Sequence, residues 1–373
     1  MTNDRRIRIL IADDSAVMRS LLRSVVASDA ALEVAGTAAD GQAALDAAAN
    51  LRPDLVLLDV EMPVMDGLAT LKAMRARGYK MPVVMCSSLT QRGAQVTLDA
   101  LAAGASDYVA KPAGQEGREA AMQALAQELI PRIHALTSQP QPLPMPFFPG
   151  PASVPPASAP RTQPPASPPV VLAIGVSTGG PAALDVLLPA LPASFPLPVL
   201  IVQHMPELFT GIFAERLNGI CPLRVRQAAE GDAVRAGTIY VARGNWHMEV
   251  LAASRPGASP TLHLTQGPPE NYCRPAVDVL FRSAAAVYGA GVLAVVLTGM
   301  GSDGMIGSRL IRDRGGSVLA QDQASSAVWG MPGAVAHAGL AQRILPLKAI
   351  APEILRLAPR PHVEVREPWK SAV

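Results

Sequence analysis

A proline-rich stretch in the middle of the chain restricts what this sequence can fold into. Residues 139–169 hold 13 of the 36 prolines and a single charged residue, Arg161. Each proline removes a backbone donor, so a helix or a sheet ladder is not expected to run through this stretch. We predict an extended, semi-stiff linker between two folded parts, with a ligand for an SH3-type domain as the alternative. A length of 373 residues also fits two or three domains.

We predict that the chain divides into four segments. The first folded part covers residues 1–125, and a helix end together with the linker covers residues 126–169. The second folded part covers residues 170–359, and a polar tail covers residues 360–373. Both folded parts alternate short apolar runs with segments of helical pattern, which is typical of α/β folds with parallel strands covered by helices.

The order of these runs predicts two α/β architectures. In the first part, five strand–helix units predict a five-stranded parallel sheet of the flavodoxin-like type, with strands at Ile7–Ala12, Leu32–Thr37, Leu55–Leu58, Val83–Cys86 and Asp107–Val109. In the second part we predict a doubly wound, mostly parallel sheet. We also predict an antiparallel hairpin formed by Thr238–Val241 and Met248–Leu251.

Charge, cysteine content and hydropathy exclude several classes of protein. The 32 Lys and Arg against 30 Asp and Glu leave no overall positive field, so nucleic acid is not the expected partner. The three cysteines are far apart, which argues against a structural zinc site or a disulfide framework. The N-terminus does not read as a signal peptide, and the longest apolar runs are too short to cross a membrane. We expect a soluble cytoplasmic protein that is not inserted in the membrane.

Chemically reactive side chains follow the predicted strands of the first part. Asp13 and Asp14 follow the first strand, Asp59 the third, Ser87 the fourth and Lys111 the fifth. In an open parallel sheet, ligands gather at the carboxyl ends of the strands, so these side chains should converge. Three carboxylates together favour a hard cation such as Mg²⁺, which takes oxygen ligands. The alternative is that these acids are helix caps and surface charges.

This set resembles the receiver domain of two-component response regulators. The resemblance extends to Met62-Pro63-x-Met65-Asp66-Gly67, Tyr108 and Lys111-Pro112, and it covers about the first 125 residues. It implies that Asp59 is the phosphoryl acceptor and that Ser87, Tyr108 and Lys111 respond to phosphorylation. It also implies a Mg²⁺ site made by Asp13, Asp14, Asp59 and the backbone carbonyl of Glu61.

The second part opens with a serine on a strand-to-helix turn. Gly175-Val-Ser177-Thr-Gly179 follows an aliphatic run and has the G-x-S-x-G spacing of a nucleophile elbow. The helix that follows offers free N–H groups, which would stabilise an oxyanion formed at Ser177. The same kind of turn can instead bind a phosphate, so the motif alone leaves both interpretations open.

A histidine and an aspartate follow two further predicted strands. His204 follows the strand Val199–Gln203, and His247 is the second candidate for the general base. Asp303 lies in the glycine-rich turn after the strand Val292–Leu297, and Asp278 is the competing acid. The chain order Ser…His…Asp differs from that of the α/β-hydrolases, so the shared elbow spacing does not imply that fold.

At this point the whole chain resembles the CheB family of chemotaxis methylesterases. The matching segments are Gly175–Pro181, Gln203–Pro206, Arg274–Phe281, Leu297–Gly304, Gln321–Ser326 and Gly330–Pro332. One departure is Cys273, at a position where the family often has a histidine before the Arg-Pro pair.

The resemblance implies a phosphorylation-activated serine hydrolase. Its substrates would be γ-glutamyl methyl esters and certain glutamines of chemoreceptors, and its activating kinase would be of the CheA type. It implies the triad Ser177, His204 and Asp303 with no cofactor, and it points to the Met300 N–H as an oxyanion donor. Thr178 either positions His204 or the substrate, or caps the helix. The resemblance further suggests that the unphosphorylated receiver covers the esterase cleft.

Other functions remain open at this stage. The second part could bind an anion without catalysis, or it could act on another ester. A transcription factor would need a compact basic helix-turn-helix after the linker, whereas the sequence shows repeated strand–helix units.

Overall fold

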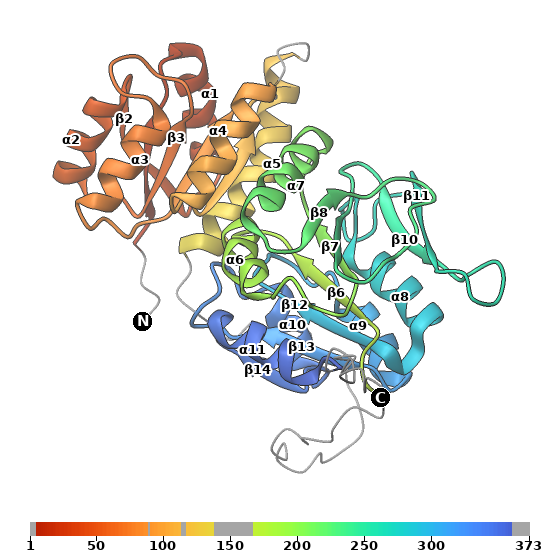
Figure 1. Ribbon diagram of the computed structural model, residues 1–373. Helices are drawn as coiled ribbons and strands as arrows, with labels where there is room; N and C mark the ends of the chain where they lie inside the picture. The colour runs from red at the N-terminus through yellow and green to blue at the C-terminus, as the bar shows by residue number, and fades with distance from the viewer. Residues whose placement is uncertain (1–4, 89, 113–116, 138–166, 360–373) are drawn as a thin grey trace, which may run out of the picture.

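The computed structural model describes residues 5–88, 90–112, 117–137 and 167–359. Most of the predicted linker and the tail from residue 360 lie outside the described residues. The chain forms two α/β units that pack against each other, one coloured red to yellow and one green to blue in Figure 1. The predicted boundary at residue 125 falls inside helix α5 (Arg118–Thr137), which continues without interruption beyond it.

The first unit has the predicted five-stranded parallel sheet. Its strand order is β2-β1-β3-β4-β5, with every described pairing parallel. The elements in chain order are β1 (Ile7–Ala12), α1 (Ala16–Ala27), β2 (Leu32–Ala38), α2 (Gly41–Leu51), β3 (Leu55–Asp59), α3 (Gly67–Ala76), β4 (Val83–Ser87), α4 (Gln91–Ala102), β5 (Asp107–Ala110) and α5.

Local sequence explains where these elements lie. Strands β3 and β4 are buried along their whole length, as the unbroken apolar runs predict for a sheet covered on both faces. The four helices α1 to α4 each begin after a residue whose side-chain oxygen accepts the N–H three residues later, which satisfies a donor that the helix leaves free. These capping residues are Ser15, Asp40, Asp66 and Thr90.

The second unit is built on a seven-stranded sheet. Its order is β14-β13-β12-β6-β7-β9-β8, and all its pairings are parallel. The elements are β6 (Val171–Val176), α6 (Gly180–Leu187), η1 (Leu188–Ala190), β7 (Val199–Gln203), α7 (Glu207–Ile220), β8 (Arg224–Gln227), β9 (Thr238–Val241), β10 (His247–Leu251), β11 (Thr261–Thr265), α8 (Val277–Tyr288), η2 (Gly289–Gly291), β12 (Val292–Val296), α9 (Met305–Asp313), β13 (Ser317–Gln321), α10 (Met331–His337), β14 (Arg343–Leu345) and α11 (Leu347–Leu357).

An antiparallel hairpin exists, but the predicted pairing of its strands was wrong. Strand β9 lies between β7 and β8 in the parallel sheet, whereas β10 pairs with β11. The close succession of β9 and β10 suggested a hairpin. However, β9 pairs with strands on both sides within the buried sheet, and β10 belongs to a separate two-stranded sheet.

The sheet order brings three loops together. Strand β6 lies between β12 and β7, so the carboxyl ends of these three strands are adjacent at one edge of the sheet. Ser177, His204 and the turn that contains Asp303 follow these three strands. Chains that bind ligands on open parallel sheets do so at such an edge.

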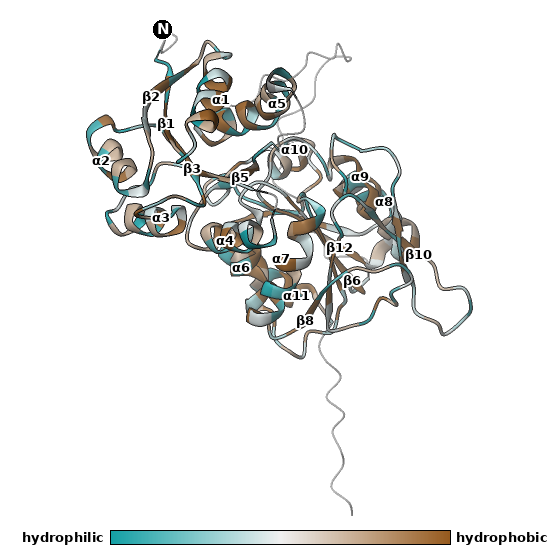
Figure 2. Ribbon diagram, turned by 90° about the horizontal axis from the view of Figure 1, so that it is seen from above, coloured by the Kyte–Doolittle hydropathy of each residue, from teal (hydrophilic) through white to brown (hydrophobic). Residues whose placement is uncertain are grey.

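The two units contact each other through helices. Helix α4 of the first unit packs against α6 and α7 of the second, and the three helices lie together in Figure 2. Apolar side chains of both units form one continuous buried cluster. Within it, the ring of Tyr108 stacks on Phe209, with the ring centroids 4.8 Å apart. Within the described residues, none of the helices has the length and apolar character needed to cross a bilayer.

Candidate functional site

Ser177 lies on a sharp turn between β6 and α6. Its N–H donates to the carbonyl of Thr298 at 3.0 Å, and its own carbonyl accepts the N–H of Gly180 at 2.8 Å. Gly179 has φ +75°, a left-handed conformation that favours glycine, and a Cβ there would come within 2.5 Å of Ala327. The glycine therefore permits the turn that the G-x-S-x-G spacing predicts.

Gln203 fixes the backbone of the serine relative to that of the histidine. Its Nε2 donates to the carbonyl of Ser177 at 3.0 Å and to that of His204 at 3.1 Å, and the residue is only 2% exposed. A Cβ on Gly180 would lie 2.1 Å from the Gln203 Oε1, so the glycine leaves room for this amide. The position of Gln203 at the end of β7 could be predicted from the sequence, but its role in holding the two backbones could not.

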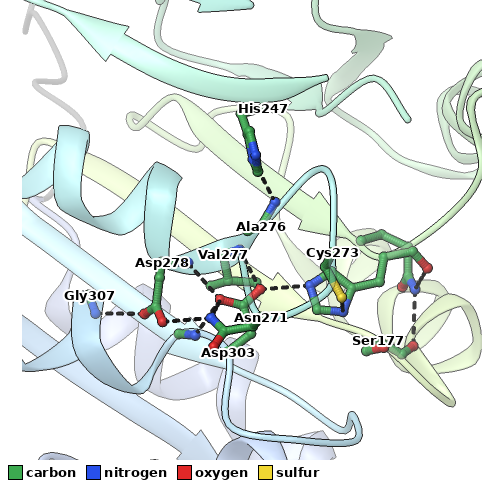
Figure 3. Close-up of polar contacts among 12 residues, drawn as sticks. Ser177, His247, Asn271, Cys273, Ala276, Val277, Asp278, Asp303 and Gly307 are labelled. Carbon is green, nitrogen blue, oxygen red and sulfur yellow. Dashed lines mark hydrogen bonds and ion pairs between the residues drawn. The ribbon is translucent and has the colours of Figure 1, made fainter. Parts of the chain in front are cut away.

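His204 and Asp303 form a buried hydrogen-bonded pair. The His204 Nε2 lies 2.8 Å from the Asp303 Oδ2 (Figure 3). Asp303 also accepts backbone N–H groups of Val277, Asp278 and Gly304 at 2.7–2.9 Å. Burial alone would raise the pKa of Asp303, but His204 and these N–H groups outweigh it and hold the pKa below its usual value. The carboxylate is therefore ionised and fixed in orientation.

Cys273 contacts the other nitrogen of the same imidazole. Its Sγ lies 3.4 Å from the His204 Nδ1 (Figure 3), a contact that the sequence analysis did not predict. Burial alone would lower the pKa of His204, but Asp303 and Cys273 outweigh it and raise the pKa to about 9. Among the described residues, no hydrogen bond joins the Ser177 hydroxyl to His204. The imidazole is thus engaged at both nitrogens, by the carboxylate and the thiol.

Asp278, the competing acid, lies behind Asp303 rather than beside the histidine. It accepts the N–H of Gly307 at 2.6 Å and the Asn271 Nδ2 at 3.0 Å, and the same Nδ2 donates to Asp303 at 2.9 Å. Burial raises the pKa of Asp278 to about 6. Asn271 therefore links the two carboxylates, and only Asp303 is hydrogen-bonded to His204.

His247, the second candidate base, has a structural place. Its Nε2 lies 3.0 Å from the carbonyl of Pro268, and its Nδ1 lies 3.2 Å from the Ala276 N–H. Figure 3 shows the ring directed toward Ala276. Both nitrogens are thus engaged by backbone groups.

Thr178 follows Ser177 in the serine turn, and Met300 lies in the segment between β12 and α9. The Thr178 hydroxyl donates to the Asp107 Oδ2 of the first unit at 2.8 Å, so this side chain lies at the contact between the units. It does not cap α6, whose N-cap is Gly179 without a side-chain hydrogen bond. Among the described residues, the N–H of Met300 has no hydrogen-bond acceptor, and the residue is 37% exposed.

The predicted acidic pocket is present in the first unit. Ligand oxygens of Asp13, Asp14 and Asp59 lie within 4.8 Å of one another. The Lys111 Nζ lies 2.8 Å from Asp13 and 2.7 Å from Asp59. Burial raises the pKa of Asp59, although Lys111 opposes this effect. Three carboxylates against one ammonium leave net negative charge and hard oxygen donors, so these residues fit a divalent cation such as Mg²⁺.

Of the three residues predicted to respond to phosphorylation, Ser87 and Tyr108 are buried. The Ser87 hydroxyl accepts from Thr97 at 2.8 Å. Tyr108 is 8% exposed beneath Phe209, and burial raises the pKa of its phenol well above the usual value. The preceding residue, Asp107, is the one that accepts the Thr178 hydroxyl. Residues of β5 therefore connect the acidic pocket with the contact between the units.

Comparisons with known proteins agree with this division of the chain. The response regulator receiver domain family matches residues 9–123, and the CheB methylesterase family matches residues 172–354. A protein-glutamate methylesterase/protein-glutamine glutaminase of Nocardioides sp. is 53% identical over 356 residues, which cover 94% of this chain and 95% of the relative. One from Trichodesmium erythraeum is 47% identical over 351 residues and covers 94% and 99%.

A solved structure is also similar to the second unit. The crystal structure of the Thermotoga maritima CheB methylesterase catalytic domain is 38% identical, with a TM-score of 0.49, and covers 51% of this chain and 99% of that one. The identities over nearly the full length, together with both family matches, establish the family of this chain. It belongs to the protein-glutamate methylesterase/protein-glutamine glutaminase family, as a receiver domain joined to a CheB methylesterase domain.

Proposed function

We propose that this chain hydrolyses γ-glutamyl methyl esters of chemoreceptors, with release of methanol, and deamidates receptor glutamines. The observation that carries the proposal is the meeting of Ser177, His204 and Asp303 at adjacent strand ends, with His204 and Asp303 joined at 2.8 Å. Methanol release from methylated receptor membranes tests it. A folded protein that releases no methanol from any such membrane contradicts the substrate assignment.

The triad supplies the proton transfers that acyl transfer needs. Neutral His204 accepts the proton of the Ser177 hydroxyl as its oxygen attacks the ester carbonyl. The proton then passes to the leaving methoxide, which departs as methanol. Water attacks the acyl-enzyme in the same way and regenerates the serine. With glutamine, ammonia takes the place of methanol. Asp303 orients the imidazole and stabilises its charged form.

Backbone donors near the serine suit the oxyanion. Helix α6 begins at Gly180, shortly after Ser177, and the N–H of Met300 has no acceptor among the described residues. A donor aimed at the developing oxyanion contributes about 3–4 kcal/mol to the lowering of the barrier. We therefore assign the Met300 N–H to this role.

The docked arrangement has the features of a resting state. The raised pKa of His204 favours its protonated form, which cannot accept the serine proton. Both its nitrogens are engaged by other partners, Asp303 and Cys273. We infer that activation frees the Nδ1 from Cys273 so that it can engage Ser177.

Two contacts between the domains support a role for the receiver domain in controlling this change. The Asp107–Thr178 hydrogen bond reaches the residue next to the nucleophile, and Tyr108 stacks on Phe209 of α7. We propose that a histidine kinase of the chemotaxis system phosphorylates Asp59. Phosphorylation can shift the docking equilibrium by no more than the difference in docking free energy between the phosphorylated and unphosphorylated forms. A tether between the domains keeps the local concentration high after separation.

Mg²⁺ would be held by the acidic pocket of the receiver domain. Asp13, Asp14, Asp59 and the backbone carbonyl of Glu61 would be its ligands. When bound, the ion neutralises charge on the phosphoryl group during transfer. The Lys111 ammonium, which lies 2.7 Å from the acceptor oxygen of Asp59, would pair with the phosphoryl oxygens afterward.

Replacement of the phosphoryl acceptor should remove activation without harming the esterase. We expect Asp59→Asn to retain the basal rate of methanol release but to show no increase with a small phosphodonor and Mg²⁺. The reason is that the amide cannot form an acyl phosphate. Asp46→Asn, an exposed aspartate of α2, is the matched control and should respond like the wild type. A phosphodonor response that persists in Asp59→Asn would contradict the assignment.

The pH dependence of kcat/KM should reveal the effect of the Cys273 thiol on the pKa of His204. A general base works only when deprotonated, so kcat/KM of the unphosphorylated enzyme should rise as the pH rises through the pKa of about 9. Since Cys273 helps to raise this pKa, Cys273→Ala should move the midpoint of the rise to lower pH. Cys221→Ala, at the end of α7, is the control and should leave it in place. An unmoved midpoint in Cys273→Ala would show that the thiol does not act on the base.

A further inference from the structure

A tight turn beside the triad has an unusual composition. Glu270 and Cys273 exchange two backbone hydrogen bonds, at 3.1 and 2.9 Å, and so close a two-residue turn. The two central residues, Asn271 and Tyr272, have φ of 53° and 62°. Turns of this kind favour Asn first and Gly second, because both positions need the left-handed conformation. Tyr272 therefore occupies a position where glycine would be less strained.

The other residues of the turn are fixed to the structure around the triad. The Glu270 carboxylate pairs with both terminal nitrogens of Arg282 at 3.0 and 2.8 Å. Asn271 donates to Asp303, and Cys273 contacts the imidazole of the general base. The turn is therefore a rigid part of the active-site wall.

Tyr272 alone points out of this wall. Its side chain is 103% exposed, and among the described residues it has no hydrogen bond or ring contact. The ring thus contributes nothing to the packing of the fold, although its backbone is held in a strained conformation. Strain that is maintained by the surrounding structure at an active site is a sign of function. Because the ring is exposed while the receiver is docked, the receiver domain does not cover it.

We propose that Tyr272 is a specificity-determining residue that contacts the receptor polypeptide around the target glutamyl side chain. This inference rests on the proposed function. Two further apolar side chains are exposed on the segment around Asp303, Met300 at 37% and Ile306 at 51%. An aromatic ring on a rigid turn suits a protein surface, since it offers a large contact area and loses little conformational entropy on binding. The methyl ester itself is too small to need such a contact.

Kinetics on methylated receptor membranes test this role, with the full chain and a phosphodonor present. Tyr272→Gly should raise KM about tenfold, the effect of losing an aromatic anchor at an interface, and leave kcat unchanged. Tyr272→Phe should behave like the wild type because it keeps the ring. The melting temperature of Tyr272→Gly should stay equal or rise, since glycine relieves the positive φ.

Arg52→Gly is the matched control for the backbone effect. Arg52 is another exposed non-glycine residue with positive φ, 48°, but it ends α2 in the receiver domain. It should leave KM unchanged. A KM for Tyr272→Gly equal to that of the wild type would overturn the proposal, as would a fall in kcat, which would make the residue a positioning residue for the triad. If wild-type enzyme releases no methanol, both the proposed function and this inference fail.

Discussion

Ser177→Ala is expected to lower methanol release from methylated receptor membranes by at least about 10⁴-fold. Without the hydroxyl no acyl-enzyme can form, and what remains is the stabilisation that backbone donors offer to direct attack by water. The assay compares wild type and variant in the presence of a phosphodonor and Mg²⁺. The hydroxyl makes no hydrogen bond to a described residue, so the melting temperature should not change.

The thiol beside the base makes a second variant necessary. In Ser177→Ala, Cys273 still contacts an imidazole that is hydrogen-bonded to Asp303, and this set resembles the groups of a cysteine hydrolase. We expect the double variant Ser177→Ala/Cys273→Ala to be no less active than the single one. Activity that survives in the single variant and disappears in the double one would identify the thiol, and not the serine, as the nucleophile.

Asp303→Asn is expected to lower kcat by about 10⁴-fold, because an amide cannot stabilise the imidazolium and can hold the wrong tautomer. It should also destabilise the fold. One carboxylate oxygen of Asp303 accepts the N–H of Val277 and the other accepts those of Asp278 and Gly304, so the amide nitrogen of Asn leaves at least one N–H without an acceptor. A buried N–H that loses its acceptor costs about 1–3 kcal/mol. Steady-state kinetics and urea unfolding measure the two effects.

Asp278→Asn is the matched control for this variant. Asp278 is also buried, and it is connected to Asp303 through Asn271, but it makes no hydrogen bond to the base. Its replacement should lower kcat far less than Asp303→Asn does. Equal losses in the two variants would mean that the orienting acid has been misassigned.

The strand-end residues were the most predictable part of the molecule. In a parallel sheet, an unbroken apolar run fixes where a strand ends, and all such ends lie at one edge. Local sequence therefore sufficed to predict that Asp13 and Asp59 meet in the first unit, and that His204 and Asp303 meet in the second. The five-stranded sheet of the first unit is confirmed for the same reason.

What depends on contacts distant in sequence could not be predicted. The partner of a short strand such as β9 is decided by the sheet that it joins, which its own pattern does not encode. Cys273 reaches His204 only because a turn folds back over the strand end. Thr178 resembled a helix cap or a residue that positions the base, but its partner, Asp107, belongs to the other domain.

That last contact limits how the receiver can communicate with the esterase. Thr178 is the residue after Ser177, and Asp107 lies on the strand that leads to Lys111, so the two centres are connected through very short stretches of chain. In the regulation proposed above, neither sheet would need to deform, because separation of the two domain surfaces would suffice to transmit the signal. Each molecule is then either closed or open. A graded adaptation signal would follow from the fraction of molecules that are open, rather than from partial activity in every molecule.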